Sequence, residues 1–125
     1  MRIAGAALNQ IPIDWENNLR NIRTAIEQAK AAGVELLCLP ELCLTGYGCE
    51  DLFLSDWMPE AALAHLQQVR AWTQGICVVV GLPVRLNHRT HNTVVRGNAD
   101  RFFLSHADHL AKSGFGRVGA KELHQ

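Results

Sequence analysis

The chain has 125 residues, which is the size of one small domain. It is 48% hydrophobic and 19% charged, a composition that is typical of globular proteins and excludes an intrinsically disordered chain. Its 12 basic and 12 acidic residues balance to a formal net charge of zero, so no long-range field favours nucleic acid or an anionic membrane surface, and we expect neither as a partner.

The first part of the chain alternates apolar strands with a helix. Residues 2–9 are small and apolar and predict a buried strand. Asp14 is a typical N-cap for a helix over residues 15–32, which has one apolar face and is followed by Gly33. Residues 34–39 predict a second strand that is buried on both faces.

A second helix and further strands follow. Residues 59–73 predict a helix that begins with proline, and residues 76–84 predict a β-branched third strand. Residues 91–95 predict another strand with an asparagine near its start, residues 96–101 form a polar turn, and residues 102–104 could begin the next strand. The order strand, helix, strand, helix, strand predicts an α/β fold with a parallel stretch of sheet.

The four cysteines and the N-terminus bear on the cellular compartment. Cys38 and Cys77 lie in apolar runs, and we expect both to be buried and inert. Cys43 and Cys49 could form a disulfide or a metal pair, but they lack CxxC spacing and no histidine lies between them, which favours reduced thiols and no metal site. No signal-peptide pattern and no apolar run of about 18 residues occur, so we expect a cytoplasmic protein without a membrane span.

Glu41 is the leading candidate for a catalytic residue. It stands where the predicted strand over residues 34–39 ends in a loop that contains proline and glycine. Ligands of α/β proteins bind just outside the carboxyl ends of the strands, and a carboxylate half shielded from water at that place suits general-base catalysis. The alternative interpretation is that Glu41 only caps a following turn.

The residues around Glu41 also carry a resemblance to a known family. Residues 39–53 read Leu-Pro-Glu-Leu-Cys-Leu-Thr-Gly-Tyr-Gly-Cys-Glu-Asp-Leu-Phe, which resembles the first catalytic motif of the nitrilase (carbon–nitrogen hydrolase) superfamily. Residues 48–57, Gly-Cys-Glu-Asp-Leu-Phe-Leu-Ser-Asp-Trp, are similar to one branch of that superfamily, the glutaminase domain of glutamine-dependent NAD synthetase.

This resemblance implies a site, a substrate and a fold. The family uses a triad of Glu, Lys and Cys, and Glu41 takes the position of its general base. Tyr47 and the loop over residues 46–51 are implied to line the pocket for glutamine, the substrate. The implied fold is an α/β/β/α sandwich, incomplete in this chain. No cofactor is implied for the amidase part; ATP and Mg²⁺ belong to a synthetase domain outside these residues, and the intact protein is implied to be a homo-oligomer.

The resemblance does not extend over the whole chain. It covers roughly residues 1–95, and beyond them the family's lysine falls on Ala107. Lys112 and Lys121 stand out of register, so no catalytic lysine is assigned. The family's nucleophilic cysteine comes after its lysine, and none of the four cysteines of this chain has the corresponding context.

We therefore expect two segments. Residues 1–95 are expected to be the N-terminal part of a carbon–nitrogen hydrolase domain, and residues 96–125 a divergent or frame-shifted tail. The expected function is that of a fragment of the glutamine-hydrolysing, ammonia-supplying domain of an NAD synthetase, inactive alone. Two alternatives stay open: a fragment of a stand-alone amidase or nitrilase, and a non-catalytic α/β binding module.

Overall fold

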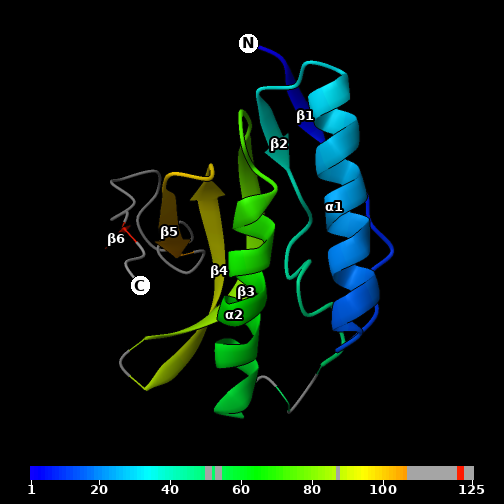
Figure 1. Cartoon of the computed structure of the whole chain (residues 1–125). Coiled ribbons are helices and arrows are strands. Elements are labelled where there is room, and N and C mark those ends of the chain that lie inside the picture. Colours follow the sequence, from blue (N-terminus) through cyan, green and yellow to red (C-terminus); the bar gives the residue numbers. More distant parts are fainter. Residues whose placement is uncertain (50–51, 53–54, 87, 107–120, 123–125) are drawn as a thin grey trace.

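A computed structural model describes residues 1–49, 52, 55–86, 88–106 and 121–122. It shows one mixed sheet with two helices packed against the same face (Figure 1). The elements in chain order are β1 (Ile3–Gly5), α1 (Trp15–Ala31), β2 (Leu36–Cys38), α2 (Trp57–Ala71), β3 (Cys77–Leu86), β4 (Arg89–Gly97), β5 (Phe102–His106) and β6 (Lys121–Glu122). The predicted α/β class is therefore confirmed.

The sheet has six strands in the order β1-β2-β3-β4-β5-β6. The strands β1, β2 and β3 run parallel, and the two helices form the crossovers between them, as the alternating order of elements predicts. From β3 onward each strand pairs antiparallel with its neighbour. A long hairpin of β3 and β4 thus lies at the middle of the sheet and carries residue 92 back toward the end of β2.

The helix α1 forms as the sequence predicts because a capping residue marks its beginning and a glycine follows its end. Asp14 is the N-cap, and its carboxylate accepts a hydrogen bond of 3.3 Å from the backbone N–H of Asn17. Gly33 follows the C-cap residue Ala32 and has a φ of +71°, the left-handed conformation that glycine adopts without strain. The last helical residue is Ala31, one residue before the predicted end.

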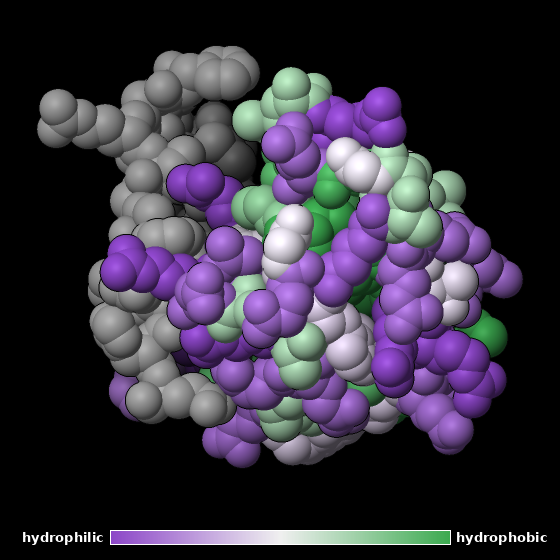
Figure 2. Space-filling view, turned by 45° about the horizontal axis from the view of Figure 1, so that its top comes forward, coloured by the Kyte–Doolittle hydropathy of each residue, from purple (hydrophilic) through white to green (hydrophobic). Residues whose placement is uncertain are grey.

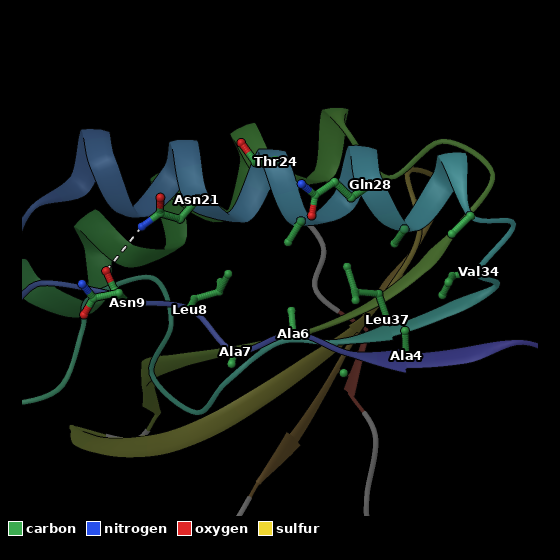
Figure 3. A pocket seen from close by; sticks show the side chains of 14 residues that line it. Ala4, Ala6, Ala7, Leu8, Asn9, Asn21, Thr24, Gln28, Val34 and Leu37 are labelled. Carbon is green, nitrogen blue, oxygen red and sulfur yellow. Dashed lines mark hydrogen bonds between the residues drawn. The ribbon is translucent and has the colours of Figure 1, made fainter.

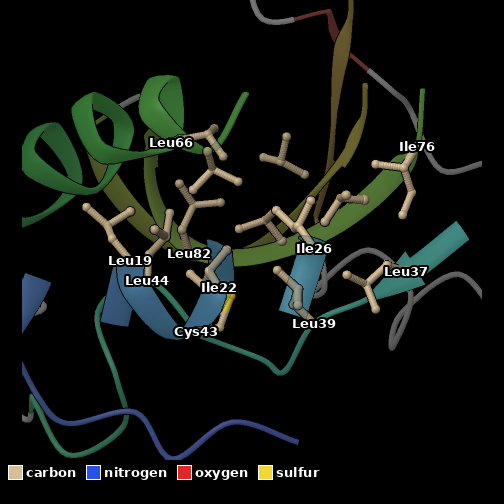
Figure 4. Close-up of a cluster of buried hydrophobic side chains, with 14 of the residues drawn as sticks. Leu19, Ile22, Ile26, Leu37, Leu39, Cys43, Leu44, Leu66, Ile76 and Leu82 are labelled. Atoms are coloured by element: carbon tan, nitrogen blue, oxygen red, sulfur yellow. The ribbon is translucent and has the colours of Figure 1, made fainter. Parts of the chain in front are cut away.

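The hydrophobic core fills the space between the helices and the sheet (Figure 4). Ile22 and Ile26 of α1 meet Leu66 of α2 there, and all three side chains are fully buried. The sheet contributes alternate residues of β3 together with neighbours on β2 and β4, namely Leu37, Val78, Val80, Leu82 and Val95. Period-2 alternation places these side chains on the helix-covered face.

The opposite face of the sheet is less covered by the described residues, and this corrects two sequence expectations. The first strand was expected to be buried, but Ile3 is 61% exposed, because β1 is the edge of the described sheet. Cys38 was expected to be buried, but it is exposed, and Cys77 is only half buried. Both cysteines alternate with core residues along their strands, so they face away from the helices.

The outer surface is largely polar. Figure 2 shows hydrophilic residues over much of one face, with hydrophobic residues gathered in a hollow between them. Within the described ranges, neither helix combines the length and the apolar character that crossing a bilayer requires.

A polar turn follows β4 but is shorter than the predicted 96–101, because Arg96 and Gly97 belong to β4 and pair with β3. The backbone N–H of Asn98 donates to the carbonyl of Arg101 at 2.9 Å, and β5 then begins at residue 102. Arg70 at the end of α2 fixes this turn, since its guanidinium donates at 2.8 Å to the carbonyls of Ala99 and of Asp100.

Candidate active site

The loop that carries Glu41 lies along β3. The backbone N–H of Leu39 donates to Val79 at 3.0 Å and so extends the pairing of β2 with β3 by one residue. Farther on, the N–H of Leu44 donates to the carbonyl of Gly81 at 3.4 Å. Leu42 between these contacts has a φ of +50°, which a leucine rarely adopts and which the surrounding contacts must stabilise. Glu41 is thereby held at the carboxyl end of β2.

Gly81 sets how closely the loop approaches the strand. A Cβ atom at this position would lie 2.5 Å from the backbone nitrogen of Leu42 and 2.9 Å from the Cα atom of Glu41. Backbone atoms cannot rotate away from such a contact as the end of a side chain can. Only glycine fits this site, because only glycine leaves the loop backbone free to contact the strand.

Asn18 connects the same loop to α1. Its side chain is 1% exposed, and its amide donates to the carbonyls of Ile11 at 2.8 Å and of Leu44 at 3.2 Å. Its carbonyl oxygen accepts from the N–H of Ile11 at 2.9 Å. All three interactions join this buried side chain to backbone groups, so its hydrogen-bonding capacity is used to hold the loops at Ile11 and Leu44.

Replacing Asn18 by leucine is expected to lower the free energy of unfolding by about 2 kcal/mol, because buried backbone groups of two loops lose their partner. Urea unfolding followed by tryptophan fluorescence measures this. Asn17→Leu is the control on the same helix, since the Asn17 side chain is exposed and contacts Asp14 at the surface. Equal midpoints for the two variants would show that the buried contacts of Asn18 contribute nothing.

The carboxylate of Glu41 accepts hydrogen bonds from two uncharged side chains. The amide Nδ2 of Asn92 on β4 donates to its Oε1 atom, and the hydroxyl of Tyr47 donates to its Oε2 atom at 3.3 Å. The two predicted site residues, Glu41 and Tyr47, therefore lie together. One donor comes from the same loop and the other from a strand 51 positions away, an arrangement that the turn-capping interpretation does not require.

One expectation about Glu41 is wrong for the described residues. We expected a half-shielded carboxylate, but Glu41 is exposed. Asn92 of β4 and Tyr47 of the loop bind the carboxylate but leave the residue accessible to solvent. Tyr47 is also exposed, at 55%. Desolvation of its hydroxyl, together with the negative charge and the hydrogen bond of Glu41, raises the pKa of Tyr47 above its ordinary value.

The two cysteines of the loop are poor nucleophiles. Cys43 is 1% exposed, its thiol donates to the carbonyl of Gly81 at 3.6 Å, and burial raises its pKa to about 12. Burial also raises the pKa of Cys49. Because the thiolate is the reactive form of cysteine, neither thiol is activated at neutral pH. The four cysteines are free thiols, so the disulfide alternative for Cys43 and Cys49 is excluded.

Thiol labelling of the folded protein is expected to distinguish the exposed cysteine from the buried ones by their reactivity. Iodoacetamide at pH 7.5 should modify the exposed Cys38 and leave Cys43 and Cys49 unmodified until the protein is unfolded in urea. Peptide mass spectrometry gives the modified fraction at each site. Equal labelling of Cys38 and Cys43 in the folded protein would contradict the buried position of the loop.

Neither a metal-binding cluster nor a catalytic lysine can be added to this site from the described residues. Within the ranges given above, no group of three or more His, Cys, Asp and Glu side chains could hold a metal ion. The family's lysine falls on Ala107, and Lys112 stands out of register with it; both residues lie outside the described residues. Lys121 belongs to β6, where only the backbone is described.

A groove of about 530 Å³ lies between β1 and α1 (Figure 3). Small apolar side chains such as Ala6 line it together with the polar side chains of Asn21, Thr24 and Gln28. Its lining contains no acid, no base and no thiol. The groove therefore lacks the acid, base and thiol side chains that hydrolysis of a carbon–nitrogen bond requires.

Sequence reasoning did not assign a role to Asn92. The sequence predicted a strand with an asparagine near its start, and an amide among β-branched strand residues was the only signal available. Its contact with Glu41 spans 51 positions of the chain and depends on the register of the β3–β4 hairpin, in which Asn92 stands opposite Pro83.

Comparisons with known proteins agree on one family. The model of the carbon-nitrogen hydrolase family matches residues 2–114. Glutamine-dependent NAD(+) synthetases from Oryza sativa subsp. indica and from Homo sapiens are 40% and 38% identical to the chain over 97 and 109 residues. These matches cover 76% and 82% of this chain but only 13% and 14% of the relatives, so the chain spans about one seventh of their length.

Solved structures give the same result for the fold. A glutamine-dependent NAD(+) synthetase from Cytophaga hutchinsonii is 56% identical with a TM-score of 0.77, and the match covers 79% of this chain and 17% of that one. An amidase from Nesterenkonia sp. is 28% identical with a TM-score of 0.66, over 79% and 38% of the two chains. The expected fold, part of a nitrilase-type sandwich, is confirmed. The chain belongs to the carbon-nitrogen hydrolase family.

Proposed function

We propose that these residues supply the general-base part of the glutamine-hydrolysing, ammonia-supplying domain of an NAD synthetase. The observation that carries this proposal is the carboxylate of Glu41, held at the carboxyl end of β2 by Asn92 and Tyr47. The 56% identity with the Cytophaga hutchinsonii synthetase supports the substrate, glutamine. Tyr47, beside the base, is proposed to line the glutamine pocket.

Hydrolysis of a carboxamide by this route needs a base, a nucleophile and donors for the oxyanion. In the proposed reaction Glu41 removes the proton from a thiol, and the thiolate attacks the carboxamide carbon of glutamine. Collapse of the tetrahedral intermediate breaks the carbon–nitrogen bond, and the proton held by Glu41 leaves with the nitrogen as ammonia. Water then hydrolyses the thioester to glutamate and regenerates the thiol, with Glu41 taking the proton from that water.

The nucleophile of this proposed reaction is not among the described cysteines of the loop, because Cys43 and Cys49 are buried and protonated. The Nesterenkonia amidase is known to carry an active-site cysteine. We propose that residues 1–125 hold the base but hydrolyse no glutamine by themselves. We likewise propose that ATP and Mg²⁺ act in a synthetase part of the intact protein.

A chimeric synthetase, called the graft below, tests the proposal by a gain of measurable activity. Residues 1–95 of this chain replace the matched segment of the Cytophaga hutchinsonii synthetase, and NAD formation is measured with glutamine and, separately, with ammonium chloride. We expect both nitrogen sources to support the reaction. A graft that melts at the temperature of the parent enzyme but uses only ammonium would contradict the proposal, because its synthetase part would work while its amidase part would not.

A stand-alone amidase is the second candidate, supported by the fold shared with the Nesterenkonia enzyme at 28% identity. The higher identity with the synthetase favours the first candidate. Acetamide, which lacks the amino acid part of glutamine, distinguishes them in the graft. Hydrolysis of acetamide at the rate of glutamine would favour the simple amidase.

A further inference from the structure

Asn92 reaches Glu41 through the pairing of β3 with β4. Cross-strand pairs place Asn92 opposite Pro83 and Val94 opposite Gly81. Because side chains alternate along a strand, Asn92 lies on the face of the sheet to which a side chain at Gly81 would point, and there the Glu41 loop contacts β3. The hairpin thus delivers the amide to the carboxylate from a different segment of the chain.

The orientation of the amide follows from this contact. Its nitrogen must face Glu41, since its oxygen there would oppose a carboxylate oxygen. The Oδ1 atom of Asn92 is turned away from Glu41, is buried and, among the described residues, has no hydrogen-bond partner. Asn18 shows the contrasting case, because both ends of its buried amide are satisfied. The Oδ1 atom of Asn92 therefore contributes no hydrogen bond to the stability of the described fold.

We propose that Asn92 is a positioning residue that fixes the carboxylate of Glu41 for its role as general base, a proposal that rests on the proposed function. Asn92 binds the Oε1 atom and Tyr47 binds the Oε2 atom, so two donors define the plane of the carboxylate. An exposed glutamate without these donors samples many rotamers. Since misplacement of a catalytic group by about 1 Å can lower a rate about 100-fold, the second donor matters for the reaction.

The single tyrosine of the chain provides a direct readout in the protein itself. Absorbance of tyrosinate at about 295 nm, followed against pH, reports only Tyr47, whose pKa is raised by desolvation, by Glu41 and by the nearby Cys43. We expect Glu41→Gln to lower the titration midpoint, because the charge and the hydrogen bond of Glu41 are lost. Asn92→Leu is expected to lower it as well, because the released carboxylate turns away from Tyr47.

Asn17→Leu is the matched control. The amide of Asn17 also donates to a carboxylate, that of Asp14 at 2.8 Å, but this pair lies at the surface in the first turn of α1, so the midpoint should equal that of the unchanged protein. Near-ultraviolet circular dichroism of the tryptophans checks that each variant is folded. If Asn92→Leu does not fold, Asn92→Ala is measured in its place. A midpoint that falls in Glu41→Gln but stays unchanged in a folded Asn92 variant would overturn the proposal.

Kinetics in the graft connect this geometry with the reaction. We expect Asn92→Leu to lower kcat for glutamine about 100-fold with little change in KM, and to leave the ammonium-dependent rate unaltered. If Glu41→Gln has no effect on glutamine use, the proposed function fails. If Glu41→Gln is strongly impaired and Asn92→Leu is not, only the role of Asn92 fails.

Discussion

Replacing Glu41 by glutamine in the grafted synthetase is expected to lower glutamine-dependent NAD formation about 1,000-fold, because general-base catalysis contributes roughly 100- to 10,000-fold to such reactions. Glutamine has the size of glutamate and can still accept the hydrogen bond of Asn92, but its neutral amide cannot take a proton from a thiol. The ammonium-dependent rate should stay the same, since it bypasses the amidase step. Initial rates with both nitrogen sources measure the effect.

Glu35→Gln is the matched control for this prediction. Glu35 precedes β2, whereas Glu41 follows it, and its exposed carboxylate accepts from the backbone N–H of Arg2 at 3.1 Å. Its replacement should leave both rates unchanged. A Glu41→Gln graft that uses glutamine as well as the Glu35→Gln graft would show that the loop carboxylate has no catalytic role.

The second large effect concerns the approach of the loop to β3. Gly81→Ala is expected to lower the free energy of unfolding by about 3 kcal/mol, because overpacking that forces a backbone shift typically costs about 1–3 kcal/mol. The added Cβ would lie 2.5 Å from the nitrogen of Leu42, so the loop must shift and Glu41 with it. In the graft, the same change should also reduce glutamine use.

Gly5→Ala is the control for Gly81→Ala, since Gly5 is also a strand glycine but nothing lies within 4 Å of an added Cβ. Urea unfolding curves of the two variants, compared with the unchanged chain, give the difference. Equal midpoints for Gly81→Ala and Gly5→Ala would mean that the loop does not contact β3 as closely as described.

The local signals in the sequence predicted the elements and the catalytic candidate. The apolar periodicity and the end signals at Asp14 and Gly33 defined α1 to within one residue, because helix ends depend on nearby residues. The loop motif brought Glu41 and Tyr47 into one site for the same reason, since only six positions separate them. Features that depend on residues close together in the sequence could therefore be predicted.

Features that depend on distant segments could not be predicted. The exposure of Cys38 depends on which elements cover each face of the sheet, and an apolar run looks the same whether one face or both are covered. The contact of Asn92 with Glu41 depends on the register of a hairpin, and a shift of one residue would point the amide to the other face. The left-handed conformation of Leu42 likewise follows from contacts with β3.

The most direct experiment measures the release of ammonia from glutamine by the purified 125-residue chain, assayed beside the graft. We expect no release above buffer from the chain, whose loop cysteines are buried and protonated, and release from the graft that Glu41→Gln abolishes. Release of ammonia by the chain alone that disappears in Glu41→Ala would contradict the separation of base and nucleophile. Equal release by the graft with and without Glu41 would contradict the role of the base.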